Sequence, residues 1–375
     1  MSSTGGRCRL TGDPELAAKL AHCLSVDPDA TLPFTHGFHA YPARMHPETA
    51  RRVIEAFPGD GRIVDPFVGS GTTAVEAVRA GRPFTGFDIS KIPLEIAWAR
   101  TRVGLPEQSR KVEGAAHRLA GRAFQEIEHE FTMLPWTRKE YEWYDPHTLR
   151  EIYVLKLLID REEEPTLRRL LTVVLSAVLV KLSKQISDSD VKKDLYHRPR
   201  PRGAAFRWFS DKSSELTRGL LLLSSDLYKR KVQFLEPDLR REDSRDAKLP
   251  PDGVDLVVSS PPYSGVYDYS RHQARRYPIF DEDPKFAEEH ELGSRRDASR
   301  YRQDMETVLK NLLGSLRPQG RIILLIGDGQ QVKADSFLTE LAAKLGGKVQ
   351  AIASQSRKDW SGGPPKQEHL IAIGR

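Results

Sequence analysis

Residues 61–81 of this 375-residue chain read GRIVDPFVGSGTTAVEAVRAG, and this stretch decides the fold. The apolar residues before Asp65-Pro66 predict a short buried strand, and the glycine-rich turn after it opens a helix that ends at Gly81. A second strand, PFTGFDIS (83–90), follows directly. A strand, a turn, a helix and a strand in this order predict a parallel α/β sheet.

Two kinds of pattern alternate in the rest of the chain. Buried-strand patterns return in the C-terminal third as VDLVVSSPPY, RIILLIGD, KVQAIASQSR and EHLIAIGR. Helical patterns dominate before them, over 110–130, 147–160, 165–184 and 212–230. We therefore expect one α/β domain that is interrupted by a large, mainly helical insertion. The expected divisions are an N-terminal extension (1–30), a first half of the domain (31–100), the insertion (101–249) and a second half (250–375).

Composition excludes several classes of protein. Hydrophobic residues make up 39% of the chain and charged residues 29%, which fits a folded core and not an integral membrane protein. The two cysteines, Cys8 and Cys23, provide neither a disulfide scaffold nor a four-ligand zinc site. The first residues lack the apolar core of a signal peptide, so we expect a cytoplasmic protein without a membrane partner. The net charge of +6 is compatible with a nucleic-acid partner.

The glycine-rich turn has the pattern G-x-G-x-x-A, formed by Gly69, Gly71 and Ala74. Such a turn places backbone N–H groups at a helix N-terminus, where they suit an anionic or polar ligand, although it can also be a tight turn and nothing more. Asp88, 17 residues after Gly71, stands where a carboxylate binds ribose hydroxyls. Asp65 would repel a pyrophosphate and attract an ammonium group. S-adenosylmethionine carries both a ribose and an amino acid, and therefore satisfies both carboxylates.

A second candidate site follows the predicted strand VDLVVS. Prolines in Ser260-Pro261-Pro262-Tyr263 make the chain rigid at the strand end. The Ser260 hydroxyl and the Pro261 carbonyl can together accept both hydrogens of a planar amino group, and Tyr263 can stack on the ring that bears it. A surface loop is the alternative interpretation. Because open α/β sheets bind ligands at the carboxyl ends of their strands, we expect this turn and the glycine-rich turn to face one pocket.

Together, DPFVGSGTT and SPPY resemble the DNA amino-methyltransferases, which transfer a methyl group from S-adenosylmethionine to an exocyclic nitrogen of a base. The segment FHAYPARMHPE (38–48) is also similar to the family, and the resemblance covers 31–100 and 250–375. It implies a Rossmann-like, doubly wound methyltransferase sheet. In this family Asp-Pro-Pro-Tyr is common among adenine-N6 enzymes and Ser-Pro-Pro-Tyr is usual among cytosine-N4 enzymes, so Ser260 favours cytosine N4.

The resemblance also assigns residues to roles. Those that would bind the cofactor are Asp65, Pro66, Phe67, Gly69, Gly71, Thr72 and Asp88. Those that would hold the target base are Ser260, Pro261, Pro262 and Tyr263. The order of the motifs places target recognition in the insertion, 101–249.

Two basic segments are candidates for nucleic-acid contact, because cations bind phosphates and aromatic rings stack on bases. The candidates directly after SPPY are Arg271, His272, Arg275 and Arg276, whose alternative role is pairing with the acidic run 281–283. The candidates in the insertion are Arg200, Arg202, Arg207 and Trp208, with a solvated loop as the alternative. We expect no metal site, and we expect His36, His39 and His46 to serve packing and pocket polarity.

The sequence therefore favours a site-specific DNA methyltransferase that acts on a base flipped out of the helix, with cytosine N4 as the first target. Adenine N6 in DNA and an amino group of an RNA base are the alternatives. A nicotinamide-dependent oxidoreductase or a nucleotide-binding module would explain the glycine turn but neither Asp65 nor SPPY. A cognate restriction endonuclease is a candidate partner, and the oligomeric state is not predicted.

Overall fold

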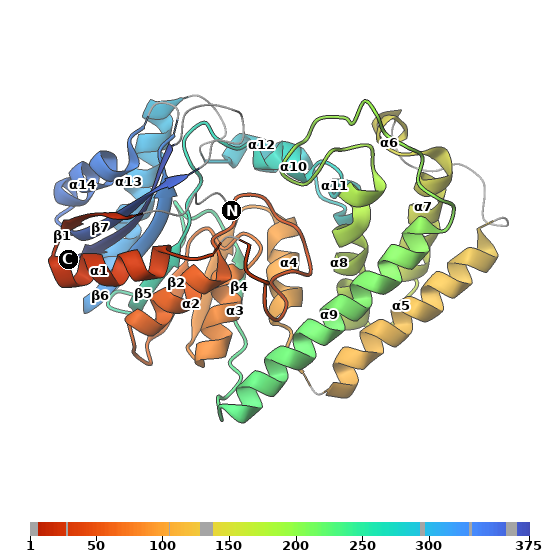
Figure 1. The fold of residues 1–375 in the computed structure, drawn as a ribbon, viewed down its shortest axis with the longest axis horizontal. Coiled ribbons are helices and arrows are strands. Elements are labelled where there is room, and N and C mark those ends of the chain that lie inside the picture. Colours follow the sequence, from red (N-terminus) through yellow and green to blue (C-terminus); the bar gives the residue numbers. More distant parts are fainter. Residues whose placement is uncertain are drawn as a thin grey trace.

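The computed structural model describes residues 7–27, 29–104, 106–127, 138–292, 297–329, 332–357 and 366–375. Within these residues the strands form one eight-stranded sheet (Figure 1). The strands are β1 (Arg9–Gly12), β2 (Arg62–Asp65), β3 (Phe84–Asp88), β4 (Asp238–Arg241), β5 (Val254–Ser259), β6 (Leu316–Gly327), β7 (Lys348–Arg357) and β8 (Lys366–Gly374). Their order across the sheet is β1-β7-β8-β6-β5-β2-β3-β4.

The strand order is that of a doubly wound sheet. Strands β4, β3, β2, β5 and β6 pair in parallel, whereas β8 runs antiparallel to β6 and to β7. From β2 the chain moves outward to β3 and β4, and then returns to β5 on the other side of β2. The switch point therefore lies between β2 and β5, where sheets of this kind bind ligands outside the carboxyl ends of the strands. The predicted doubly wound α/β fold is confirmed.

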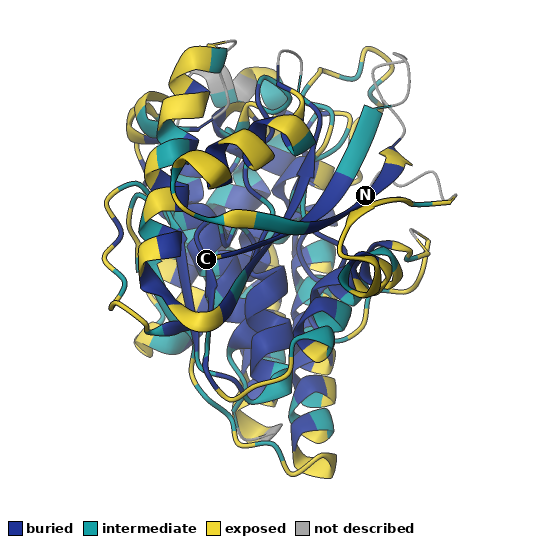
Figure 2. Cartoon of the chain, turned by 90° about the vertical axis from the view of Figure 1, so that its left-hand side faces the viewer, coloured by how far each residue is buried: buried dark blue, intermediate teal, exposed yellow. Residues whose placement is uncertain are grey.

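Helices cover both faces of this sheet. The helices are α1 (Pro14–Leu24), α2 (Pro47–Ala56), α3 (Thr72–Ala80), α4 (Lys91–Thr101), α5 (Pro106–Glu126), α6 (Arg138–Trp143), α7 (Pro146–Asp160), α8 (Pro165–Leu182), α9 (Ala204–Lys229), α10 (Tyr269–Gln273), α11 (Tyr277–Phe280), α12 (Pro284–His290), α13 (Ala298–Ser315) and α14 (Ala334–Lys344). On one face α2 and α3 contribute Val53 and Ala77 to an apolar core, and on the other α13 and α14 contribute Leu309 and Leu338. Figure 2 shows the central strands largely buried, with helices whose outer sides are exposed.

The helices α5 and α7 to α9 pack with α4 into a third apolar core, beside the sheet in Figure 1. The apolar run that begins at Leu170 lies in α8, where Leu171, Val174 and Leu175 are fully buried against this core. Burial on nearly all sides explains why α8 has so few polar positions. In the described parts of the chain, no helix is long and apolar enough to cross a membrane.

Two short strands lie outside the expected half-domains. Residues 238–241, within the range expected for the insertion, form β4, which pairs in parallel with β3. Residues 9–12 of the expected N-terminal extension form β1, which pairs with β7 at the opposite edge. The helices of the insertion therefore end at Lys229, and the chain rejoins the sheet before residue 250.

Candidate active site

One buried carboxylate joins the end of β2 to the end of β5. Asp65 Oδ1 accepts a hydrogen bond from Ser259 Oγ at 2.6 Å and another from the backbone N–H of Phe67 at 3.0 Å. Burial raises the pKa of Asp65 to about 6, and these hydrogen bonds oppose the rise. Because Ser259 directly precedes Ser260, the bond holds the two predicted motifs side by side.

The turn after β2 depends on its glycines. Gly69 and Gly71 have φ angles of +49° and +81°, in the left-handed region that favours glycine. A Cβ on Gly71 would lie 2.6 Å from the Cβ of Ala97, so this glycine lets α3 start directly against α4. The N–H of Val68 donates to the Phe87 carbonyl at 2.9 Å, and the N–H of Gly71 donates to the Val68 carbonyl at 2.9 Å. Protein acceptors therefore already bind these two amides of the turn.

Asp88, at the end of β3, accepts from the same turn. Its Oδ2 accepts from the N–H of Gly69 at 3.2 Å, and its Oδ1 accepts from the N–H of Ser90 at 3.0 Å. Burial raises the pKa of Asp88 to about 7, against the effect of the two hydrogen bonds. Asp88 and the glycine-rich turn thus form a single bonded unit.

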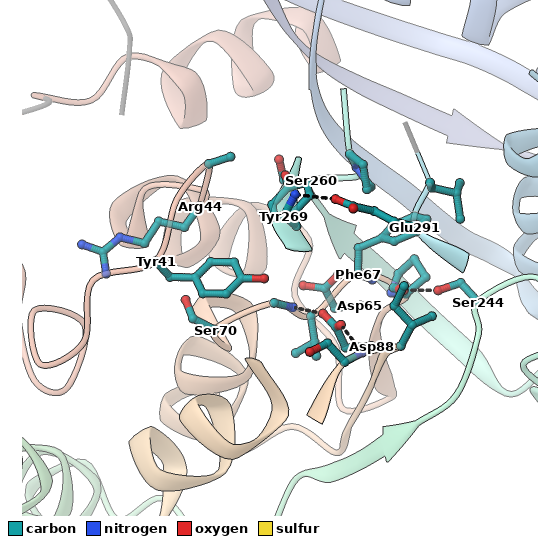
Figure 3. A pocket seen from close by; sticks show the side chains of 18 of the residues that line it. Tyr41, Arg44, Asp65, Phe67, Ser70, Asp88, Ser244, Ser260, Tyr269 and Glu291 are labelled. Atoms are coloured by element: carbon teal, nitrogen blue, oxygen red, sulfur yellow. Dashed lines mark hydrogen bonds between the residues drawn. The ribbon is translucent and has the colours of Figure 1, made fainter. Parts of the chain in front are cut away.

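A cavity of about 990 Å³, part of it open to solvent, lies at the carboxyl ends of β2, β3 and β5. The predicted site residues that line it are Asp65, Pro66, Phe67, Gly69, Thr72, Asp88, Ser260 and Pro262. Figure 3 shows Ser260 on one side of this cavity, with Asp65 and Asp88 opposite. Both turns therefore face one pocket, as expected. Gly71 does not line this pocket and instead packs against Ala97 of α4.

Glu291, which follows α12, is a cavity residue that the sequence analysis missed. Its Oε1 accepts a hydrogen bond from the backbone N–H of Tyr269 at 2.5 Å (Figure 3). Burial raises the pKa of Glu291 to about 8. Together with Asp65, Asp88 and Asp243 it places four acidic side chains around the cavity, against one basic side chain, Arg44. This excess of acidic groups suits a cationic ligand. The run EDPKFAEEHE (282–291) contains several acidic residues, and nothing in it distinguishes Glu291.

Two aromatic residues and a serine complete the cavity wall. The ring of Tyr41 stacks on that of Tyr269, with centroids 6.4 Å apart and planes inclined by 24°. Ser244 Oγ donates to the carbonyl of Pro66. Tyr41 lies in the segment 38–48 that resembles the family, so that resemblance could have identified it. No sequence signal marks Ser244.

Some residues of the SPPY turn line the cavity, and others are buried away from it. Ser260 and Pro262 line the cavity, and the Pro262 carbonyl accepts from the Tyr301 hydroxyl at 3.0 Å. Tyr263 is 8% exposed and its hydroxyl donates to Glu368 Oε1 at 3.1 Å. The Arg357 guanidinium lies over its ring, 5.0 Å from the centroid. Tyr263 and Pro261 are thus not among the residues that line the cavity in this structure.

The basic segment after SPPY is largely committed to internal contacts. Arg276 is fully buried and forms an ion pair with Asp188, and not with the acidic run 281–283. His272 is buried, with its Nδ1 2.6 Å from the Asp268 carbonyl oxygen. Both side chains are thus buried in this structure, and phosphate contact by these two residues stays a prediction.

The other two members of this segment differ from each other. Arg275 is half-buried, with its guanidinium 4.0 Å from the centroid of the Trp143 ring, and burial lowers its pKa. Arg271 is exposed and stays available for phosphate contact.

The candidates in the insertion also separate by exposure. Arg202 and Arg207 are exposed. Arg200 is half-buried, with its backbone N–H donating to Asp145 Oδ2 at 3.0 Å. Trp208 carries the Lys181 ammonium 4.2 Å above its ring and is packed against the helical core. Arg200 and Trp208 thus make contacts within the helical insertion.

The three N-terminal histidines have structural partners. His36 Nε2 lies 2.7 Å from Glu76 Oε1, and His39 Nε2 lies 2.7 Å from Ser176 Oγ. Burial lowers the pKa of both rings. His46 caps α2 by accepting from a backbone N–H in its first turn.

One group among the described residues brings three metal-ligating side chains together: Asp328, Asp335 and His369. Lys333 lies 2.8 Å from Asp328, and Arg9 lies 3.0 Å from Asp335. These cations already balance the two carboxylates, and none of the three residues lines the cavity.

Residues 25–98, which contain the glycine-rich turn and Asp88, match the family described as DNA methylase (N6_N4_Mtase). Over these residues, about a fifth of the chain, the protein is similar to the DNA methylase family. The family match ends before the insertion, so the SPPY turn and the helical region lie outside the matched DNA methylase residues.

Two curated relatives agree with the DNA methylase match. The Type II methyltransferase M.MvaI of Kocuria varians is 24% identical over 249 residues, which are 62% of this chain and 54% of that protein. The Type II methyltransferase M.ScaI of Streptomyces caespitosus is 45% identical over 62 residues, 16% of this chain and 20% of its own. This chain therefore spans about half the length of the first relative and a fifth of the second.

A solved TehB-like SAM-dependent methyltransferase from Corynebacterium glutamicum aligns over 87% of this chain and 86% of its own. Its sequence identity to this chain is 12% and its TM-score is 0.34.

Proposed function

We propose that this protein is an S-adenosylmethionine-dependent DNA methyltransferase that methylates an exocyclic amino group of a base, with cytosine N4 as its target. The observation that carries the proposal is the position of Ser260 in the same cavity as Asp65 and Asp88. A cofactor held by the two carboxylates and a base held by the serine would therefore meet at the switch point of the sheet.

The lining of the cavity fits S-adenosylmethionine better than a dinucleotide. The N–H groups of Val68, Gly69 and Gly71, which would otherwise be donors for a pyrophosphate, have protein acceptors. Four acidic side chains and one arginine line the same space, and a pyrophosphate would add negative charge to it. A ligand with an ammonium and a sulfonium cation would instead reduce the excess of negative charge. Asp88 would bind the ribose hydroxyls and Asp65 would lie beside the amino-acid end.

The residues of the chain have a positioning task. The cofactor supplies a methyl group that its sulfonium already activates. An exocyclic amino nitrogen is a poor nucleophile because its lone pair is delocalised into the ring. A hydrogen bond from one of its hydrogens to Ser260 Oγ, which lines the cavity, would favour a pyramidal nitrogen and stabilise the positive charge that develops there. The two prolines that follow keep this acceptor in place.

The choice of base rests on the serine. Ser260 occupies the position at which adenine-N6 enzymes commonly have aspartate, which favours cytosine N4 over adenine N6 and over an amino group of RNA. Both curated relatives are named Type II methyltransferases, which supports DNA as the substrate. A cognate restriction endonuclease is the partner that we propose for such an enzyme, acting on the same site.

Methyl transfer from tritiated S-adenosylmethionine to mixed genomic DNA tests this function. Digestion of the product to nucleosides should give N4-methylcytosine. Recovery of N6-methyladenine would refute the argument from Ser260, and label in RNA alone would refute the DNA substrate.

The variant Ser260→Ala tests the role of the hydroxyl. It should lower the rate by about 10- to 100-fold because one acceptor of the amino group is lost. Its DNA affinity should hardly change, since phosphate contacts dominate that affinity. Ser315→Ala is the control, because Ser315 is buried before β6, at the opposite end of the strands. A Ser260→Ala rate equal to that of the control would remove Ser260 from the reaction.

A further inference from the structure

The loop between α8 and α9 (residues 183–203) exposes two large apolar side chains to water. Leu195 is 88% exposed and Tyr196 is 91% exposed, the highest values among the exposed large hydrophobic residues in the described ranges. Burial of either side chain would stabilise the fold, so folding does not explain why both project into solvent.

Hydrogen bonds hold this loop on both sides of the exposed pair. On one side, the N–H of Asp194 donates to the Lys184 carbonyl at 2.7 Å. On the other, Asp145 Oδ2 lies 3.0 Å from His197 Nε2 and accepts from the backbone N–H of Arg200 at 3.0 Å. The backbone on both sides of Leu195 and Tyr196 is therefore held by hydrogen bonds to the rest of the insertion.

Exposed cations flank the pair along the chain. Lys192 and Lys193 precede it, Arg198 and Arg202 follow it, and all four are exposed. Cations on both sides of an apolar pair are complementary to a polymer with a charged backbone and an apolar interior, which is what a DNA duplex offers.

A chain of contacts connects the loop to the active-site cavity. Asp188 of the loop pairs with Arg276, and Arg276 Nη1 donates to Gln273 Oε1 at 3.2 Å. Gln273 lines the cavity. In Figure 1 the loop runs beside α10, the helix that contains Gln273. The loop thus lies on the side of the cavity formed by the segment after SPPY.

We propose that Leu195 and Tyr196 insert into the base stack of duplex DNA and fill the space that the target base leaves when it turns into the cavity. The proposal rests on the proposed function, because it requires a base to leave the helix. Apolar side chains that enter a base step unstack it, and they compensate for contacts that the extruded base loses. The flanking cations bind the phosphates on both sides of the step.

The double variant Leu195→Ala/Tyr196→Ala tests the insertion. On duplexes that contain the methylated site found in genomic DNA, its methyl-transfer rate should fall by about 10- to 100-fold. On the same duplexes with the target base mispaired, most of the rate should return, since a mispaired base leaves the helix at lower cost. The fluorescence of 2-aminopurine beside the target base should rise with the unaltered protein and much less with the variant.

A matched control is Tyr228→Ala. Tyr228 is 86% exposed and lies near the C-terminal end of α9, roughly 36 Å along the helix from the loop. This control should keep the parental rate on both duplexes. The slope of DNA affinity against salt should be the same for all three proteins, because no cation has been removed.

The outcomes separate the two proposals. If the unaltered protein methylates DNA and the double variant does so equally well on matched duplexes, the insertion is refuted while the function stands. If the variant loses the same factor on matched and mispaired duplexes, the loop is a simple contact surface and the insertion is again refuted. If the unaltered protein methylates RNA alone or nothing, the proposed function fails first.

Discussion

The turn after β2 and the basic segment after SPPY both follow strands of the same sheet, yet they relate differently to their sequences. In the turn, Asp65, Gly69 and Asp88 meet at one cavity, as their spacing predicts. In the basic segment, Arg271 is exposed while Arg276 is fully buried. When the residues of a motif bond to one another, the sequence of the motif predicts where its side chains lie. A run of charged residues does not predict which of its side chains will be exposed.

The physical reason lies in the distance along the chain between partners. The N–H of Gly69 reaches Asp88 across a single helix, a separation that the strand–helix–strand unit itself defines. The partner of Arg276 is Asp188, 88 residues away in another structural unit. Local rules cannot predict such a pair, so two arginines of the same short segment differ completely in exposure.

The largest effect that would sharpen this comparison is expected from Arg276→Ala. It removes a fully buried guanidinium, leaves Asp188 without its cation at a part-buried contact, and should lower the free energy of unfolding by about 3–5 kcal/mol. Chemical denaturation measures the change. The exposed Arg271→Ala should leave stability within about 0.5 kcal/mol and reduce the salt dependence of DNA affinity by up to about one unit. Equal stabilities for the two variants would break the comparison.

A somewhat smaller effect is expected from Gly71→Ala in the cofactor turn. The added Cβ meets Ala97 at 2.6 Å, and the φ of +81° is unfavourable for alanine. Together these should cost about 2–4 kcal/mol of unfolding free energy and weaken cofactor binding. Gly121→Ala is the control, because nothing lies within 4 Å of a Cβ in α5, and it should stabilise the protein by about 0.5–1 kcal/mol. Thermal unfolding with and without S-adenosylmethionine distinguishes them; a stable Gly71→Ala protein that still binds would contradict the close-packing argument.

The smallest effect concerns Asp88→Asn. Loss of a charge-assisted bond to ribose should cost about 1.5–3 kcal/mol, or roughly a 10- to 150-fold weaker affinity for S-adenosylmethionine by calorimetry. Asp60→Asn, exposed just before β2, should bind as the unaltered protein does. Unchanged affinity in Asp88→Asn would exclude Asp88 from the pocket.

The same variant has a consequence for stability against pH. Burial raises the pKa of Asp88 from 3.8 to about 7. Between these values the folded protein holds a proton that the unfolded chain has released, so its contribution to stability is present at low pH and is lost as the pH rises toward 7. Asp88→Asn should therefore flatten the fall in unfolding free energy between pH 4 and pH 7, and an unaltered slope would contradict the raised pKa.

Much of the fold could be predicted because its signals are local. The buried strands and the long helix α8 have clear apolar patterns, which predict an α/β sheet with a helical insertion. The resemblance to the family implied the doubly wound arrangement. The strands β1 and β4 could not be predicted: each has four residues, and RLTG and DLRR carry no buried apolar run. They are strands only because a neighbouring edge offers unpaired backbone groups.

The site residues that lie in sequence motifs could be predicted, and the others could not. Its two turns have characteristic sequences, so most cavity residues on them were identified. Glu291 and Ser244 come to the cavity from segments without a motif, through packing that no spacing rule describes. Tyr263 follows SPPY closely, but Arg357 and Glu368, both distant in the chain, determine the place of its ring in this structure.

An ion pair joins the two ends of the helical insertion beside the sheet. Arg102, just after α4, forms a 2.6 Å ion pair with Glu236, just before β4. The chain therefore leaves the sheet and returns to it at neighbouring points. Segments whose two ends lie close together are the ones most readily inserted or replaced without disturbing the rest of a fold. What a replacement module must supply is an apolar face for Ile92 and Ile96 of α4, which pack into the core of the insertion. The sheet and the helical insertion are thus joined by two neighbouring crossings of the chain and by one shared apolar core.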